Sequence, residues 1–469
     1  MSERPFELPR SPEEERRSAF PWIVLGLLLA FLISGQLAGY LARGASSGDP
    51  NRAVESTFRQ MTMAYEIQER LHEGQAKGRK GEATARGDAR DRIRQEIENL
   101  ARGLEDRLKS DSEAALLHAA MHFVIRREVD FGRYGSSTRR LSKSKQTALK
   151  VLSGQVASPE EARAASREIT GGSLPEVLAR TRAQELAGDK DARTRAFPTP
   201  KLIAFSVLNA AHMFGLSIGG ILLVVYAIGR RNGKWRPLGH PVGQLSGPDA
   251  DRFALRTGQL LSVYLIVSFA VQAAASDLAD PYRALAQTLL FLTGAILLFK
   301  VPVWDKMIEL ARLGLEARNL VPKLTWALCG LLANLPLLII AHGISMSLFQ
   351  SLPEPEHPLM REVGSHGALG YAALFVSAGL IGPVFEEIVF RGTLLPALSS
   401  LFRSPFWGIV VSSLIFGAIH PTGIPAWAPL AMVGAMAAML TYQTRSLVPA
   451  IALHVMHNSS LLVYSWAIS

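Results

Sequence analysis

The sequence is poor in cysteine and in repeated segments. Cys329 is the single cysteine, so an intrachain disulfide is impossible. Because it lies inside an apolar run, we interpret it as a small core residue. There is no internal repeat, and the inverted repeats typical of many secondary transporters are missing. No clear A-x-A cleavage site follows the first apolar run, so we do not expect a cleaved signal peptide.

Two familiar hydrolase motifs are also absent in their working form. Gly44-Ala45-Ser46-Ser47-Gly48 matches G-x-S-x-G, but it follows an apolar run rather than a strand, so the nucleophile-elbow context is missing. His72-Glu73 begins a zincin motif, but Ala76 stands where the second histidine is needed. Neither segment therefore predicts chemistry.

Long apolar runs dominate what the sequence does contain. Nine runs come near the ~20 residues that cross a bilayer as a helix. They are Phe20–Ala42, Leu202–Gly229, Ala254–Ala275, Ala284–Val303, Thr325–Phe349, Ala368–Leu401, Phe406–His420, Ala426–Gln443 and Leu447–Ala467. Helices are expected because lipid offers backbone groups no hydrogen-bond partners. Ala368–Leu401 is too long for one straight crossing, and Phe406–His420 is short.

The net charge of +10 does not require a nucleic-acid partner. Basic residues gather in alternate short loops, whereas the loops between them are poor in lysine and arginine. The basic residues are Arg230, Arg231, Lys234, Arg236, Lys306, Arg312, Arg318, Lys323, Arg403 and Arg445. The positive-inside rule then predicts a cytoplasmic N-terminus and an outer C-terminus.

Three regions follow from this pattern. Residues 1–43 are predicted to be a cytoplasmic tail and an uncleaved signal-anchor helix. Residues 44–200 have no spanning run, and amphipathic patterns predict a helical extramembrane domain on the outer face, of unknown function. Residues 201–469 are predicted to be a multi-pass membrane domain. We therefore expect an all-α fold with a bundle of about eight membrane helices, in what the architecture suggests is a bacterial inner membrane.

Ionisable residues interrupt the run Ala368–Leu401. Charged side chains inside a membrane are costly and are functional candidates by default. Arg391 follows Glu387 by four residues, one helical turn, so the two can pair. Glu386 points about 100° away, toward a different partner. Pro383, just before them, is expected to kink the helix beside a buried or watery cavity.

Two further apolar runs carry imidazoles. His420 ends one run, and His454 and Asn458 share a face of the last. His457 is offset from that face, so we interpret it as structural. A carboxylate and imidazoles in a dry site are the parts of a hydrolase, and they can also hold Zn²⁺. By counting, His420 lies near the outer end of its helix and Glu386 near the inner side, so helices must tilt or their ends shift.

These motifs resemble a known family. Glu386-Glu387-x-x-x-Arg391, Phe416-x-x-x-His420 and His454-x-x-x-Asn458 are similar, in order and spacing, to the three motifs of the CPBP family, also called Abi. This family groups type II CAAX prenyl endopeptidases with bacteriocin-processing and immunity proteins. The resemblance covers roughly residues 325–469.

The resemblance implies an intramembrane endopeptidase acting on a membrane-associated or lipidated protein. Glu386 would activate water, with Glu387 and Arg391 positioning it. His420 would hold the water or a metal, and His454 and Asn458 would stabilise the oxyanion or complete a ligand set. Proteins of this family have been described both as metalloproteases and as metal-independent glutamate proteases, so a Zn²⁺ ion on Glu386, His420 and His454 stays open.

Two other functions remain open on the sequence alone. A non-catalytic membrane immunity or scaffold protein could keep the same helix bundle. A proton-coupled transporter could use the buried acids as relays. No serine or cysteine nucleophile accompanies the motifs, so we expect direct attack by water with no acyl-enzyme.

Overall fold

A computed structural model describes residues 18–45, 50–76, 83–126, 129–134, 140–235, 238–275, 313–316, 318–350, 352, 368–420 and 422–469. Throughout these residues the secondary structure is helical, with no strand. The predicted all-α fold is confirmed. The chain divides into two compact units, one of residues 47–209 and one that combines residues 1–46 with 210–467.

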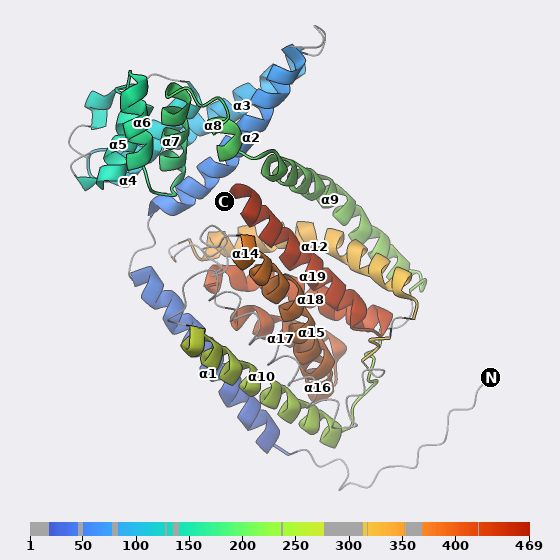
Figure 1. Cartoon of the computed structure of the whole chain (residues 1–469). Helices are drawn as coiled ribbons and strands as arrows, with labels where there is room; N and C mark the ends of the chain where they lie inside the picture. Colours follow the sequence, from blue (N-terminus) through green and yellow to red (C-terminus); the bar gives the residue numbers. More distant parts are fainter. Residues whose placement is uncertain are drawn as a thin grey trace, which may run out of the picture. The chain divides into compact units, whose positions relative to one another are not determined.

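The unit of residues 47–209 is a bundle of amphipathic helices (Figure 1). Its helices are α2 (Pro50–Ala76), α3 (Ala83–Arg102), α4 (Ser112–Val124), α5 (Lys143–Leu152), α6 (Pro159–Glu168), α7 (Leu174–Leu186) and α8 (Ala192–Ala196). Buried apolar side chains such as Phe58, Ile97, Met121 and Leu149 form its core. Ser158 caps α6 by accepting a hydrogen bond from the Glu161 amide.

The second unit holds the long apolar helices. They are α1 (Phe20–Ala45), α9 (Thr199–Arg231), which begins in the other unit, α10 (Gly247–Ala275), α12 (Leu320–Leu348), α14 (Ala368–Leu374), α15 (Gly382–Glu387), α16 (Leu395–Leu401), α17 (Pro405–Ala418), α18 (Ile424–Thr444) and α19 (Val448–Ile468). Every predicted apolar run within the described residues is therefore helical. The run Ala284–Val303 lies outside them.

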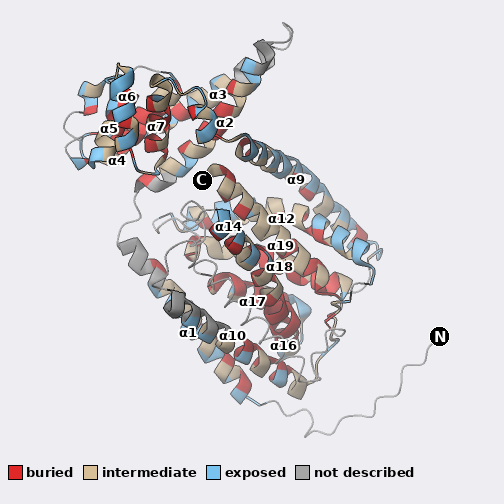
Figure 2. Ribbon diagram, viewed as in Figure 1, coloured by how far each residue is buried: buried red, intermediate tan, exposed pale blue. Residues whose placement is uncertain are grey.

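Five of the described helices are long and apolar enough to cross a membrane. They are α1, α9, α12, α18 and the continuous stretch Ala368–Leu401, while α17 is apolar but shorter. The chain is thus an integral membrane protein, and its orientation stays a prediction. Along α9, exposed residues dominate, whereas buried residues gather on α16 to α18 (Figure 2).

The first membrane helix is packed into this bundle. Helix α1 runs along α10 (Figure 1). Asp251, at the start of α10, accepts hydrogen bonds from the Ser18 amide at 2.5 Å and from Nε1 of Trp22 at 2.7 Å. Leu25 and Phe253 then join an apolar core with Phe385 and Phe390.

The stretch Ala368–Leu401 changes its winding twice. π-helical segments occupy Phe375–Ile381 and Ile388–Leu394, on either side of α15. Pro383 has no amide hydrogen, and the Gly382 amide bonds to the carbonyl of Ser377 five residues back. π-Helical turns are rare in proteins, and those that occur often lie at functional sites. The kink predicted at Pro383 stays a prediction, and two wider turns flank Glu386 and Glu387.

Candidate active site

Glu387 is the centre of a buried polar cluster. Its Oε1 atom accepts hydrogen bonds from Nη1 of Arg391 at 2.9 Å and from Nδ1 of His454 at 2.8 Å. The side chains of Glu387 and Arg391 are 0% and 1% exposed. A buried carboxylate is tolerated when it is paired and hydrogen-bonded, as here. The cluster therefore ties the long helix to α19.

Phe416 of α17 forms the wall of this cluster. Its ring lies 4.5 Å from the guanidinium carbon of Arg391 and packs edge-on against the His454 ring, with centroids 5.6 Å apart. The centroid of the His420 ring lies 4.6 Å from the centroid of the Phe416 ring. One aromatic side chain therefore contacts a cation and two imidazoles, and so links three of the motif residues.

Glu386 faces the two imidazoles. Its Oε2 atom lies 3.6 Å from Nε2 of His420 and 3.9 Å from Nε2 of His454. This oxygen is buried and has no hydrogen-bond partner among the described residues. The side chain as a whole is 25% exposed, so Glu386 is the more accessible of the two acids. Distances above 3.5 Å leave room for a bridging water or ion rather than a direct hydrogen bond.

The structure brings five of the six predicted site residues together: Glu386, Glu387, Arg391, His420 and His454. His420 stands just beyond α17, where its Nδ1 atom lies 2.5 Å from the carbonyl oxygen of Phe416. Asn458, the sixth, donates from Nδ2 to the carbonyl of Ala378 at 3.1 Å, in the first π-helical segment. His457 has no contact with the two acids in the described structure.

Three supporting residues were not predicted from the sequence. The ring of Phe416 was quoted only as part of a motif. His240, in the loop between α9 and α10, lies with Nε2 2.6 Å from the carbonyl of Arg391, and burial lowers its pKa to about 4. Gly434 of α18 approaches so closely that an added Cβ would lie 3.0 Å from Nη2 of Arg391. An isolated histidine in a loop and a glycine among many carry no sequence signal for these roles.

The donor set has the right chemistry for zinc, but its geometry is looser. One carboxylate oxygen and two Nε2 atoms are typical catalytic zinc ligands, and adjacent ligands on tetrahedral zinc lie roughly 3.3 Å apart. The distances from Glu386 Oε2 to the two imidazoles are a few tenths of an ångström longer. Within the described residues, no group of three His, Cys, Asp or Glu side chains is already arranged to hold a metal ion. The three side chains fit a metal only after a small approach.

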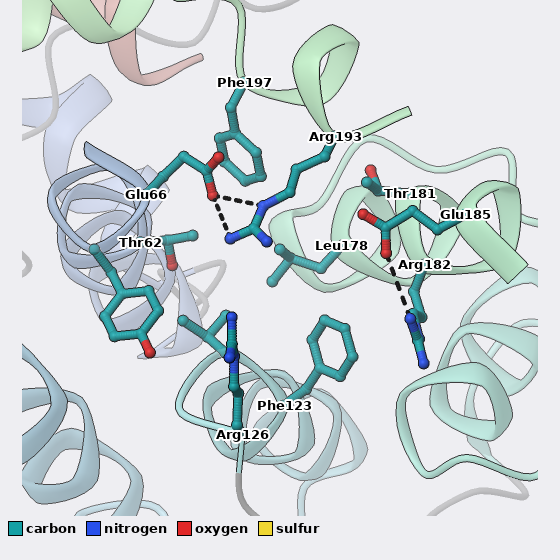
Figure 3. A pocket seen from close by; sticks show the side chains of 12 residues that line it. Thr62, Glu66, Phe123, Arg126, Leu178, Thr181, Arg182, Glu185, Arg193 and Phe197 are labelled. Carbon is teal, nitrogen blue, oxygen red and sulfur yellow. Dashed lines mark hydrogen bonds and ion pairs between the residues drawn. The ribbon is translucent and has the colours of Figure 1, made fainter. Parts of the chain in front are cut away.

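A pocket also lies in the unit of residues 47–209, far in sequence from the cluster around Glu386. It has a volume of about 530 Å³ and lies among α2, α4 and α7 (Figure 3). Its arginines are matched by acids: Arg193 pairs with Glu66 at 2.8 Å, and Arg182 lies 3.5 Å from Glu185. The pocket contains no histidine or cysteine. It offers no base or nucleophile comparable to the cluster around Glu386.

Comparison with known proteins bears on the membrane unit. Residues 368–460 match the family model described as type II CAAX prenyl endopeptidase Rce1-like. The predicted family resemblance is confirmed over this segment. The comparisons with curated proteins and with solved structures gave no match.

The Rce1-like segment contains the whole cluster. It begins with α14 and ends in α19, so it spans Glu386, Glu387, Arg391, His420, His454 and Asn458. At the level of the family, the match supports a CAAX-type membrane endopeptidase. The roles of the individual residues, the substrate and the use of a metal belong to the proposal that follows.

Proposed function

We propose that the protein is an intramembrane endopeptidase in which Glu386 activates a water molecule that attacks a peptide bond. The observation that carries this proposal is the environment of Glu386. A buried carboxylate oxygen without a hydrogen-bond partner among the described residues faces two imidazole Nε2 atoms at 3.6 and 3.9 Å. Such a grouping suits a small molecule held between acid and imidazole.

The partners of the two Nδ1 atoms fix the imidazole tautomers. Carboxylate and carbonyl oxygens only accept hydrogen bonds. Nδ1 of His454 therefore donates to Glu387, and Nδ1 of His420 donates to the Phe416 carbonyl. In the neutral rings, Nε2 then carries a lone pair directed toward Glu386. A water that donates one hydrogen to Glu386 and one to an imidazole would keep its own lone pairs free for attack.

The reaction can then be written without a covalent enzyme intermediate. The water oxygen bonds to the substrate carbonyl carbon as its proton moves to Glu386, and the carbonyl oxygen takes the negative charge. Glu386 returns the proton to the amide nitrogen as the carbon–nitrogen bond breaks. The side-chain amide of Asn458 has two hydrogens. It donates one of them to the carbonyl oxygen of Ala378, and we propose that it donates the second to the oxyanion.

Glu387 and Arg391 act as positioning residues. The bond from His454 to Glu387 keeps that imidazole in one tautomer, and Arg391 neutralises the acid that it contacts. The substrate is expected to reach the site from the membrane, so we propose a membrane-associated or lipidated protein. A prenylated CAAX protein is one member of that class.

A zinc ion remains an alternative to an unassisted water. Glu386, His420 and His454 would hold it, and a bound zinc would polarise the substrate carbonyl and lower the pKa of a bound water. In that case the bond from His454 to Glu387 would orient a ligand, a pattern common in zinc sites. Incubation of the purified protein with a chelator, followed by metal analysis and an activity assay, separates the two mechanisms.

The experiment that tests the function compares new protein termini in membranes that contain wild type or Glu386→Gln at matched expression. Glu160→Gln, an exposed substitution on α6, is the control for a change of one carboxylate elsewhere. We expect specific new termini with wild type and with Glu160→Gln but not with Glu386→Gln. Identical termini in all three membranes, with the variants folded and inserted, would contradict a protease and favour an immunity or scaffold role.

A further inference from the structure

A second cavity lies in the membrane unit, between α9, α12 and α18. Its volume is about 460 Å³, and it shares no lining residue with the cluster around Glu386. Its walls are almost wholly apolar, with Leu222, Cys329 and Met436 among them. The hydroxyl of Tyr226 and the amide oxygen of Gln443, which are polar groups in the wall, satisfy each other at 3.0 Å. A polar ligand would therefore find little to bind there.

Helices α9 and α12 approach each other closely at a level next to the cavity. A Cβ on Gly219 would lie 2.0 Å from the carbonyl oxygen of Leu332, and one on Gly215 would lie 2.5 Å from Leu335. Small residues four apart allow such close approach of membrane helices. Beyond these glycines, the side chains of α9 that line the crevice are Leu222, Leu223, Val225 and Tyr226.

The crevice lies within helices expected to face lipid. The outward side chains of α9 beside it, Ile221, Val224 and Ile228, are all more than half exposed and apolar. An apolar hollow of this kind, open toward a bilayer, is best filled by a hydrocarbon chain, since water has no partners in it.

Aromatic side chains mark one end of the crevice. Tyr226 stacks with Trp235 at 6.1 Å, and Trp235 meets Trp326 edge-on at 5.5 Å. Nε1 of Trp235 donates a hydrogen bond to the carbonyl oxygen of Tyr226 at 3.0 Å, which holds the Trp235 ring against the last turns of α9. Tryptophan and tyrosine are enriched at the headgroup level of membranes. This end of the crevice is therefore where a lipid headgroup would lie.

The same end is strongly basic. The flanking described residues 230–235, 313–316, 318–325 and 443–446 include a single acid, Glu316. They include six cations, Arg230, Arg231, Lys234, Arg318, Lys323 and Arg445. Basic clusters beside gaps between membrane helices are suited to anionic headgroups.

We propose that this crevice binds one anionic phospholipid, with an acyl chain between α9, α12 and α18 and the phosphate among the cations beside Trp235. The lipid would fill the crevice and hold α9 against α12 and α18. The site is independent of the proposed peptidase activity.

Native mass spectrometry of the purified full chain tests the proposal. After removal of bound lipid, the protein is titrated with phosphatidylglycerol or with phosphatidylcholine of the same acyl chains. We expect one tightly retained phosphatidylglycerol, preferred by roughly tenfold, given the usual gain from each basic residue at a membrane surface. Equal retention of the two lipids, or retention of neither, would overturn the proposal.

Matched variants locate the site. Arg230→Gln with Lys234→Gln should abolish the preference, whereas Arg252→Gln with Arg403→Gln, at other helix ends, should preserve it. Cys329→Phe fills the crevice and should reduce retention of both lipids. Val224→Phe, on the outer face of α9, adds similar bulk and should not. If the first pair of substitutions retains the preference, the headgroup assignment is wrong.

Cys329 provides a test without any substitution. It is the single cysteine of the chain, and it lies half-buried on the wall of the crevice, so its interpretation as a core residue was wrong. Its alkylation by N-ethylmaleimide, followed by intact mass, should slow several-fold in phosphatidylglycerol relative to phosphatidylcholine at equal lipid content. Equal alkylation rates in the two lipids would place the lipid elsewhere and contradict the proposal, even if Cys329→Phe failed to fold.

Discussion

His454 and Glu387 are joined by a hydrogen bond of 2.8 Å between Nδ1 and Oε1, at the oxygen that also receives Arg391. Glu387 is thus paired with Arg391 and with Nδ1 of His454. Glu386 faces Nε2, the other nitrogen of the same imidazole. Two adjacent acids in one helix therefore have different environments. We assign chemistry to Glu386 and positioning to Glu387 for this reason.

Glu387→Gln is expected to lower the stability of the protein as well as its activity. The substitution leaves the buried guanidinium of Arg391 without its counter-charge, and breaking a buried pair in this way costs about 3–5 kcal/mol. We expect a clear fall in Tm in detergent together with loss of activity. The measurement is thermal unfolding followed by an assay with a substrate found by terminus mapping.

Glu386→Gln is the matched comparison for Glu387→Gln. Because Oε2 of Glu386 has no hydrogen-bond partner among the described residues, its loss should leave the unfolding temperature nearly unchanged. Activity should still fall by at least about a hundredfold, the usual range for a general base. If Glu386→Gln lowered Tm as far as Glu387→Gln, the division of labour between the two acids would be wrong.

Sequence reasoning reached the parts of this site that depend on local periodicity. The pairing of Glu387 with Arg391 follows from a spacing of one helical turn, and the structure has it at 2.9 Å. The predicted divergence of Glu386 from Glu387 also follows from helical geometry. Spacing could not identify His454 as the partner of Glu387, because that contact depends on how α19 packs against the long helix.

The depth of His420 shows what counting along helices cannot supply. Equal rises per residue put His420 and Glu386 near opposite sides of the membrane, yet the two side chains lie 3.6 Å apart. Two π-helical segments alter the rise and winding of the long helix, and no pattern in the sequence announces them. The loop residue His240 was missed for a similar reason, since a tertiary contact alone brings it to Arg391.

Phe416→Leu should impair both catalysis and stability. The ring contacts Arg391 and both imidazoles, so a smaller side chain frees three motif residues at once. Loss of the cation–π contact and of some packing costs about 1–3 kcal/mol. Misplaced catalytic groups can cost roughly a hundredfold in rate. Turnover and Tm of the variant are compared with those of Phe402→Leu, at an exposed position; equal losses in both variants would contradict the assignment.

Neighbouring glycines of α9 give a packing prediction with its own control. Gly219→Ala places a Cβ against the backbone of Leu332, which cannot yield easily, so α9 must move away from α12. Overpacking of this kind costs about 1–3 kcal/mol. Gly220→Ala meets nothing within 4 Å and should be neutral or slightly stabilising. Thermal unfolding in detergent distinguishes them, and equal Tm values would show that α9 does not pack as described.

His118 makes the stability of the unit of residues 47–209 depend on pH. The residue is 1% exposed, and burial, aided by the charges of His122 and Arg133, lowers its pKa to about 4 from 6.5. Below pH 6.5, His118 is protonated in the unfolded chain, whereas in the folded unit it stays neutral until the pH falls to about 4. Stability is therefore full above pH 6.5 and falls as the pH drops through this window, by up to about 3 kcal/mol.

Hydrogen-exchange mass spectrometry of the full chain measures this dependence on peptides from α4, after correction for the intrinsic exchange rate. Wild type should lose protection between pH 6.5 and 4 more steeply than His118→Gln, because glutamine cannot take up the proton. His72→Gln, at an exposed position of α2, removes one histidine without changing a buried site and should follow the wild type. Carboxylates contribute equally to all three proteins, so the difference between slopes isolates His118. Parallel slopes for wild type and His118→Gln would mean that His118 accepts its proton in the folded unit as easily as in water.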